Sequence, residues 1–175
     1  MLNTKDIIQS SGIQFGTSGA RGLVEQFTPE VCSAFAHAFI SIMARQFSFT
    51  QVAVAIDNRP SSPSMAQAIV SAIESLGFEA VYYGVIPTPA LAYTAMQANM
   101  PSIMITGSHI PFDRNGIKFY RPDGEISKSD EQAILTESVA FDIEHHQSQL
   151  NVNQSAAKSY EERYSALFDR SFLQG

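Results

Sequence analysis

The strongest constraint on the fold is an unbroken apolar run, Val52-Ala53-Val54-Ala55-Ile56. A strand with one solvated face would alternate apolar and polar residues, so this run predicts a strand that is buried on both faces. Helical patterns lie on either side of it, one from Thr28-Pro29-Glu30 to about Gln46 and one from Ser62-Pro63 to Leu76. A strand buried on both faces between two amphipathic helices predicts an α/β domain.

The remaining elements follow from similar signals. Strands are expected at 79–83, 102–106 and 116–121, and helices at about 89–98, 127–143 and 160–173. Asn115-Gly116 is typical of a turn and is interpreted as the entry to the 116–121 strand. The glycine-rich segment 15–22 is interpreted as a loop near a short strand. This order predicts a three-layer α/β domain, with a mixed, mostly parallel sheet between helices.

Charge and cysteine content narrow the class of protein. The 11 basic and 17 acidic residues give a formal net charge of −6, with no basic stripe, so we expect no nucleic-acid partner. No apolar run approaches the ~20 residues of a membrane span, so we expect no membrane partner. Cys32 is the only cysteine, and the first residues do not resemble a signal peptide. These features predict a cytoplasmic protein.

The segment with the most chemistry is Thr106-Gly107-Ser108-His109-Ile110-Pro111, which follows a predicted strand. Ser108 is a weak nucleophile at neutral pH and needs activation, which His109 can supply by sharing a proton. A phosphoserine would carry roughly −1.5 to −2 charge and would need cations, for which Lys118 and Arg21 are the candidates. The alternative interpretation is an ordinary polar turn that carries a surface histidine.

Other polar residues receive structural interpretations. Asp57 and Arg59 follow the 52–56 strand and are predicted to brace the neighbouring loops instead of touching substrate. His37 falls opposite the apolar stripe of its helix and is predicted to be solvated. The adjacent histidines His145-His146 could suggest a metal site, but adjacent residues on a helix face different directions and cannot readily bind one ion together. They are therefore predicted to be a surface pair.

Several segments, in a fixed order, resemble the motifs of the α-D-phosphohexomutase family, which includes phosphomannomutase, phosphoglucomutase and phosphoglucosamine mutase. The segments are 15–22 (FGTSGARG), 57–63 (DNRPSSP), 84–91 (GVIPTPAL), 106–111 (TGSHIP), 115–119 (NGIKF) and 122–124 (PDG). Any one of these would be a weak signal, but the ordered set is specific. The resemblance covers residues 13 to about 130.

The resemblance implies a particular chemistry. Ser108 matches the serine that family members carry as phosphoserine, and this group phosphorylates a hexose monophosphate to give a 1,6-bisphosphate. Arg21, His109 and Lys118 fall on motif positions near the transferred group, where they would stabilise charge and move protons. The family requires Mg²⁺, and the phosphoserine oxygen of Ser108 would be one of its ligands. The preferred subtype is a phosphomannomutase/phosphoglucomutase acting on a hexose phosphate of mannose or glucose.

Two departures from the family shape the predicted domain organisation. Ile110 stands where the family usually has Asn, and no Asp-rich cluster is present to complete a Mg²⁺ site. We therefore expect residues 1–148 to be the first, serine-bearing domain and 149–175 to be a linker and the start of a second domain. The partners would then include the missing C-terminal domains of the same enzyme, and the chain alone would be inactive. Two alternatives stay open: a phosphoglucosamine mutase N-terminal domain, and a stand-alone, non-catalytic module that binds phosphorylated ligands.

Overall fold

The computed structural model describes residues 1–16, 19–143 and 148–168. The strands are β1 (Leu2–Asn3), β2 (Gln14–Gly16), β3 (Gly19–Leu23), β4 (Gln51–Ile56), β5 (Glu79–Val85), β6 (Ser102–Ile105), β7 (Arg114–Arg121), β8 (Gly124–Glu125) and β9 (Ala140–Phe141). The helices are α1 (Thr4–Ser10), the 3₁₀ turn η1 (Val24–Gln26), α2 (Pro29–Gln46), α3 (Ser62–Ser75), α4 (Thr88–Gln97), α5 (Lys128–Thr136) and α6 (Ser155–Ser165). Among these, no helix is long and apolar enough to cross a bilayer.

The main sheet has the strand order β2-β3-β7-β6-β4-β5, and β8 pairs with β7. Pairing is parallel between β4 and each of its neighbours, β5 and β6, and antiparallel elsewhere. The prediction of a mixed sheet is confirmed, but the prediction that it is mostly parallel is wrong, because four of its six strand pairings are antiparallel. The segment interpreted as a loop, 15–22, contributes most of β2 and β3, and these two strands extend the sheet beyond β7.

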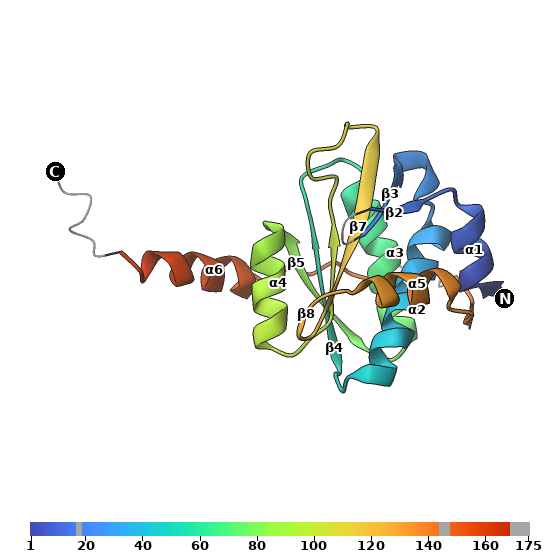
Figure 1. Cartoon of the computed structure of the whole chain (residues 1–175). Coiled ribbons are helices and arrows are strands. Elements are labelled where there is room, and N and C mark those ends of the chain that lie inside the picture. Colours follow the sequence, from blue (N-terminus) through green and yellow to red (C-terminus); the bar gives the residue numbers. More distant parts are fainter. Residues whose placement is uncertain (17–18, 144–147, 169–175) are drawn as a thin grey trace.

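Helices cover the sheet on both sides, which confirms the three-layer architecture. Figure 1 shows α1, α2, α3 and α5 on one side of the sheet and α4 on the other. The central strand β4 alternates between these layers: Val52, Val54 and Ile56 belong to the core under α2 and α3, whereas Ala53 and Ala55 belong to the core under α4. The strand therefore has no polar position, because both of its faces are covered.

Local sequence signals define the start of α2 and the end of α3, as predicted. The Thr28 hydroxyl accepts a hydrogen bond from the Val31 N–H, and Pro29 occupies the first turn of α2. Gly77 follows α3 with φ +81°, a left-handed conformation that ends the helix and that glycine adopts without strain.

The prediction of a turn at Asn115-Gly116 is wrong, because both residues lie inside β7. Asn115 is fully buried, and its side-chain amide donates to the hydroxyls of Ser61 (2.8 Å) and Ser62 (3.1 Å). This polar cluster gives the asparagine a buried role in the strand, and the tertiary contacts override the local turn preference.

The predicted helix at 127–143 is too long, since α5 ends at Thr136. The Thr4 hydroxyl donates to the Glu137 carbonyl and accepts from the Val139 N–H, which draws the chain toward the N-terminus. Ala140 then pairs with Asn3 in the β1–β9 ladder. The C-terminal helix also differs from its predicted span of 160–173: α6 covers 155–165, and residues 169–175 lie outside the described part of the chain.

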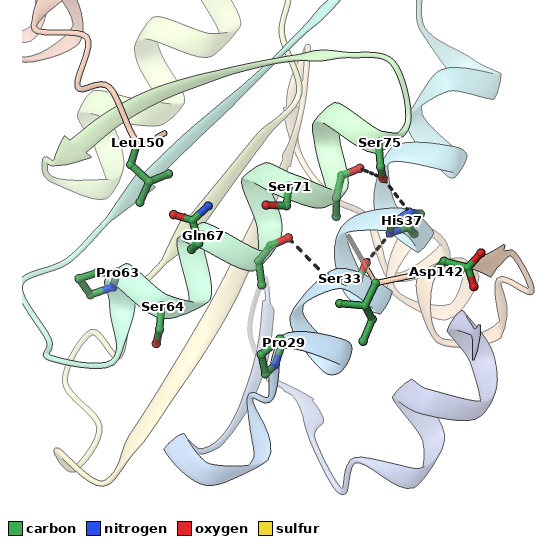
Figure 2. Close-up of a pocket in the computed structure, with 13 residues that line it drawn as sticks. Pro29, Ser33, His37, Pro63, Ser64, Gln67, Ser71, Ser75, Asp142 and Leu150 are labelled. Atoms are coloured by element: carbon green, nitrogen blue, oxygen red, sulfur yellow. Dashed lines mark hydrogen bonds between the residues drawn. The ribbon is translucent and has the colours of Figure 1, made fainter. Parts of the chain in front are cut away.

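The prediction that His37 is solvated is also wrong, because its side chain is buried in the wall of a pocket of about 500 Å³ (Figure 2). Its ring stacks on Phe141, with 4.7 Å between ring centroids, so β9 covers the helix face that was expected to meet water. Nδ1–H donates to the Ser33 carbonyl (2.9 Å) because a carbonyl can only accept, which sets the tautomer of the neutral ring. His145 and His146 lie outside the described residues.

Candidate active site

The serine loop, residues 106–114, leaves the carboxyl end of β6 and presents Ser108 to solvent. Ser108 has φ +50°, the left-handed region that residues with a side chain seldom occupy. Two hydrogen bonds hold the turn: the Ser108 N–H donates to the Thr106 hydroxyl (2.9 Å), and the Ile110 N–H donates to the Gly107 carbonyl (3.0 Å). An uncommon backbone conformation held by its surroundings is typical of a functional loop.

His109 is the nearest titratable partner of this serine. The Ser108 Oγ and the His109 Nδ1 are 3.2 Å apart, and both side chains are exposed. This is hydrogen-bond distance, so the imidazole can accept the hydroxyl proton or return it. The structure thus places the Ser108 hydroxyl and the His109 imidazole within hydrogen-bond distance of each other.

Asp57 anchors the loop from the end of β4. One carboxylate oxygen accepts the Gly107 N–H (2.8 Å), and the other accepts the Ser62 hydroxyl (2.6 Å) and the Arg59 N–H (3.0 Å). Burial acts to raise the pKa of Asp57, but these hydrogen bonds outweigh it, and the pKa lies below its ordinary value. The carboxylate is therefore charged at neutral pH and holds the residue that precedes Ser108.

Arg59 anchors the other end of the loop. Its guanidinium donates to the carbonyls of Ile110 (2.6 Å), Pro111 (2.7 Å) and Arg114 (2.8 Å), and its Nε lies 3.4 Å from Asp57. These contacts confirm that Asp57 and Arg59 brace the loop. A planar guanidinium with its donors in a fixed fork is suited to hold several carbonyls at once.

Position 107 must be a glycine, because the Arg59 side chain crosses the loop there. A Cβ added to it would stand 2.1 Å from the Arg59 guanidinium carbon, a distance that no real contact permits. The glycine next to Ser108 therefore makes room for the arginine that braces the loop. The motif needs the glycine for this close approach, independently of any ligand.

Arg21 and Lys118 lie on one face of two adjacent strands. In the β3–β7 ladder, Arg21 pairs with Gly116, and Gly19 pairs with Lys118. Residues two apart on a strand face the same way, so the two cations are diagonal neighbours on that face. The serine loop begins at the same level, because the Thr106 N–H donates to the Gly116 carbonyl (3.0 Å).

Two glycines lie beneath the Arg21 side chain. The Arg21 side chain passes over Gly16, where an added Cβ would lie 3.4 Å from the arginine Cδ, and over Gly116, where it would lie 3.4 Å from Cγ. Sequence reasoning proposed both cations but did not place them on one face, because the segment carrying Arg21 was interpreted as a loop.

The buried cluster of Asn115, Ser61 and Ser62 was missed as a support of the site. It joins β7 to the start of α3, and Ser62 also donates to Asp57. The sequence did contain a signal for this buried asparagine. Asn115 is two residues from Ile117 and four from Phe119, so it shares the core face of the strand with these buried side chains.

The described residues do not form a site for a hard divalent cation. Nowhere in the described ranges do three or more His, Cys, Asp or Glu side chains come together as a metal site would require. Mg²⁺ prefers several oxygen ligands in near-octahedral geometry, and Ser108 contributes one oxygen. These residues alone therefore do not fit a magnesium centre.

Comparison with known sequences places this arrangement within a family of enzymes. The family described as phosphoglucomutase/phosphomannomutase, alpha/beta/alpha domain I, matches residues 12–142. This match covers the sheet, the serine loop and both cations. The chain belongs to the phosphoglucomutase/phosphomannomutase family.

Individual relatives agree with this assignment. The chain is 57% identical over 173 residues to a phosphomannomutase from Salmonella muenchen, covering 99% of this chain and 36% of that protein. It is 40% identical to a phosphomannomutase from Sinorhizobium fredii, covering 94% of this chain and 36% of that protein. A phosphoglucosamine mutase from Clostridium kluyveri is 35% identical over 132 residues, covering 74% of this chain and 28% of that protein. The chain thus spans about a third of the length of these relatives.

Solved structures support the fold. A putative phosphomannomutase from Thermus thermophilus superposes with a TM-score of 0.74 at 24% sequence identity, covering 90% of this chain and 36% of that one. A phosphoglucomutase/phosphomannomutase family protein from Burkholderia thailandensis gives a TM-score of 0.60 at 23% identity, with 87% and 30% coverage.

Proposed function

We propose that this chain is the serine-bearing domain of a phosphohexomutase, which interconverts hexose 1-phosphate and hexose 6-phosphate. The observation that carries the proposal is the braced loop, in which Ser108 is exposed at φ +50° with its hydroxyl 3.2 Å from His109. The strand face that carries Arg21 and Lys118 lies beside the start of this loop. A nucleophile, a proton partner and two cations are what phosphoryl transfer requires of a protein.

In the proposed reaction, phosphorylated Ser108 gives its phosphoryl group to a hydroxyl of the hexose monophosphate. The new bond joins the sugar oxygen to phosphorus as the bond from phosphorus to Ser108 Oγ breaks, and the product is a hexose 1,6-bisphosphate. The sugar hydroxyl loses its proton as it attacks, and this proton reaches the departing Ser108 Oγ through His109 Nδ1, so no proton is gained or lost overall. Transfer of the other phosphate back to Ser108 restores the phosphoserine, while Arg21 and Lys118 stabilise the charge on the moving group.

The finer assignments are part of the same proposal. We favour mannose or glucose phosphates as substrates, since two of the relatives are named phosphomannomutases. Mg²⁺ would bind a phosphoserine oxygen and take its remaining ligands from the rest of the enzyme. Residues 1–148 would be the first domain and 149–175 the link to the next. A cytoplasmic location is supported by the single, buried thiol of Cys32.

Mass spectrometry of phosphopeptides tests the proposal directly. The full-length enzyme from its native host should carry phosphate on Ser108, and incubation with isotopically labelled hexose monophosphate should exchange this phosphate for a labelled one, because each cycle returns the other phosphate to the serine. Ser108→Ala should abolish mutase turnover, whereas Ser64→Ala, which alters an exposed serine at the start of α3, should leave it unchanged. A fully active enzyme with unmodified Ser108 throughout turnover would refute the assignment.

A further inference from the structure

The pocket that contains His37 lies along the junction of α2 and α3, apart from the serine loop (Figure 2). Its volume of about 500 Å³ is typical of sites that bind small molecules. From α2 it is lined by Pro29, Ser33 and His37, which are four residues apart and therefore lie on one face of the helix. Neither the serine loop nor Arg21 or Lys118 belongs to the described lining, so this pocket is separate from the candidate active site.

Small side chains on α3 leave this space open. Ala68, Ala72 and Ser75 line the pocket and are three or four residues apart, so they share the face of α3 that borders it. Protein interiors are close-packed, and larger side chains at these three positions would fill the space between the two helices. Small residues alone do not indicate a ligand, and the case for one rests on the polar group in the wall.

That polar group is the Nε2 atom of His37. The residue is only 5% exposed, and Nδ1–H donates to the Ser33 carbonyl, so Nε2 of the neutral ring is an acceptor. Its described neighbour, the Ser75 hydroxyl, is 3.4 Å away, and the single proton of that hydroxyl is donated to the Ala72 carbonyl at 2.9 Å. Within the described residues Nε2 therefore receives no hydrogen bond, and a buried acceptor without a donor costs free energy.

The charges around the pocket favour an uncharged ligand. No Lys or Arg belongs to the described lining, and burial lowers the pKa of His37, so its ring is neutral at neutral pH. Asp142 is the carboxylate among the described lining residues, and it pairs with the Met1 ammonium group (3.3 Å). The apolar part of the described lining includes Pro29, Pro63, Ile143 and Leu150. A phosphorylated sugar would find no cationic side chain here, whereas an apolar ring would be well covered.

We infer that this pocket binds a small, uncharged molecule whose apolar ring carries an N–H group, and that this N–H donates to His37 Nε2. The apolar lining holds the ring, and the buried acceptor selects molecules that bring a donor, as is usual where a few polar groups orient a ligand in an apolar pocket. The inference does not depend on the proposed function, because no residue of the candidate active site takes part in it.

Two isomers of equal size test the inference: 3-methylindole, which has an N–H donor, and 1-methylindole, which has none. Titrations of the 175-residue chain at about pH 8, where the lowered pKa keeps His37 neutral, should show 3-methylindole binding about tenfold more tightly. Nitrogen-15 NMR should show the His37 Nε2 resonance moving toward that of a hydrogen-bonded nitrogen with 3-methylindole only. Equal affinities, an unmoved Nε2 resonance, or no binding of 3-methylindole up to its solubility limit would overturn the inference.

Substitutions locate the binding within the molecule. Ala68→Leu narrows the pocket without removing the acceptor and should weaken 3-methylindole binding about tenfold. Ala157→Leu is the matched control, since it makes the same change at an exposed position of α6 and should leave the affinity unchanged. His37→Leu removes the acceptor and should give the two isomers equal affinity. Undiminished binding by a folded Ala68→Leu variant would place the ligand elsewhere and contradict the inference. Circular dichroism reports the fold of each variant, and the comparison of isomers on the unaltered chain decides the case even if His37→Leu does not fold.

Discussion

At the scale of single residues, the position of Ser108 depends on an arginine that is not expected to touch the substrate. Arg59 ties three carbonyls of the serine loop together and also meets Asp57, which holds the Gly107 N–H. A loop fixed at both ends loses little freedom when a substrate binds. Positioning of this kind supplies much of the rate in phosphoryl transfer.

Arg59→Lys is therefore expected to lower kcat of the full-length enzyme by about 10- to 100-fold with little change in KM, because an ammonium cannot hold three carbonyls in one plane. Steady-state kinetics measures both constants. Arg45→Lys is the matched control: Arg45 pairs with Glu137 on the surface and should leave kcat unchanged. A large rise in KM for Arg59→Lys would instead indicate that Arg59 contacts the substrate.

The thiol of Cys32 provides a second prediction at this scale. The side chain is fully buried, and burial, with a smaller contribution from the nearby Glu30 carboxylate, raises its pKa to about 12. The thiolate is the reactive form, so native protein at pH 8 should react with a thiol reagent only as fast as it opens. Labelling of the Cys32 thiol can be followed by absorbance at increasing urea concentrations. The reaction should become rapid only at the concentrations that unfold the protein. Stoichiometric labelling of the folded protein within seconds would contradict this.

At the scale of elements, local signals predicted the structure where they met no competition. The strand at 52–56 and the starts of α2 and α3 were predicted from an apolar run, an N-cap and prolines, and all are present. Asn115-Gly116 and the stretch after Thr136 carry local preferences that tertiary partners override. Those partners lie far away in the sequence, so no local pattern reveals them.

In the candidate site, too, some contacts follow from the local sequence and others depend on residues far apart in the chain. Ser108 and His109 are adjacent, so their contact could be predicted from the motif alone. The common face of Arg21 and Lys118 depends on the register between β3 and β7. This register follows from pairing across about ninety residues of chain, and a one-residue slip would turn these side chains to the other face.

The packing of β9 on α2 makes stability sensitive to acid. Burial lowers the pKa of His37, although its bond to the Ser33 carbonyl acts in the opposite direction. The unfolded state therefore binds more protons, so the free energy of unfolding should fall as pH drops below about 6.5, through the lowered pKa. Urea titrations between pH 8 and 5 measure this slope. His37→Gln should flatten the slope, and an unchanged slope would assign the sensitivity to other groups.

At the scale of the whole molecule, the described residues supply only part of what a phosphohexomutase needs. They include the proposed phosphoryl carrier, its proposed proton partner and two cations, but among them no group of three or more His, Cys, Asp or Glu side chains could hold a divalent ion. The relatives are about three times as long, since the chain spans 36% of two of them. Figure 1 shows α6 beside α4, leading away from the sheet. The two residues Leu167 and Phe168, which come shortly after the end of α6, expose large apolar side chains.

The chain alone is therefore expected to bind phosphorylated sugars without converting them. With Mg²⁺ and a glucose 1,6-bisphosphate primer, turnover of glucose 1-phosphate should stay below about one-hundredth of that of a full-length phosphomannomutase, because most of the positioning of the sugar is absent. Phosphorus NMR follows both the conversion and the binding in one sample. Turnover close to that of the full-length enzyme would show that this chain holds the metal and the sugar by itself. Binding without turnover, lost in Lys118→Gln, is the result that an incomplete active site predicts.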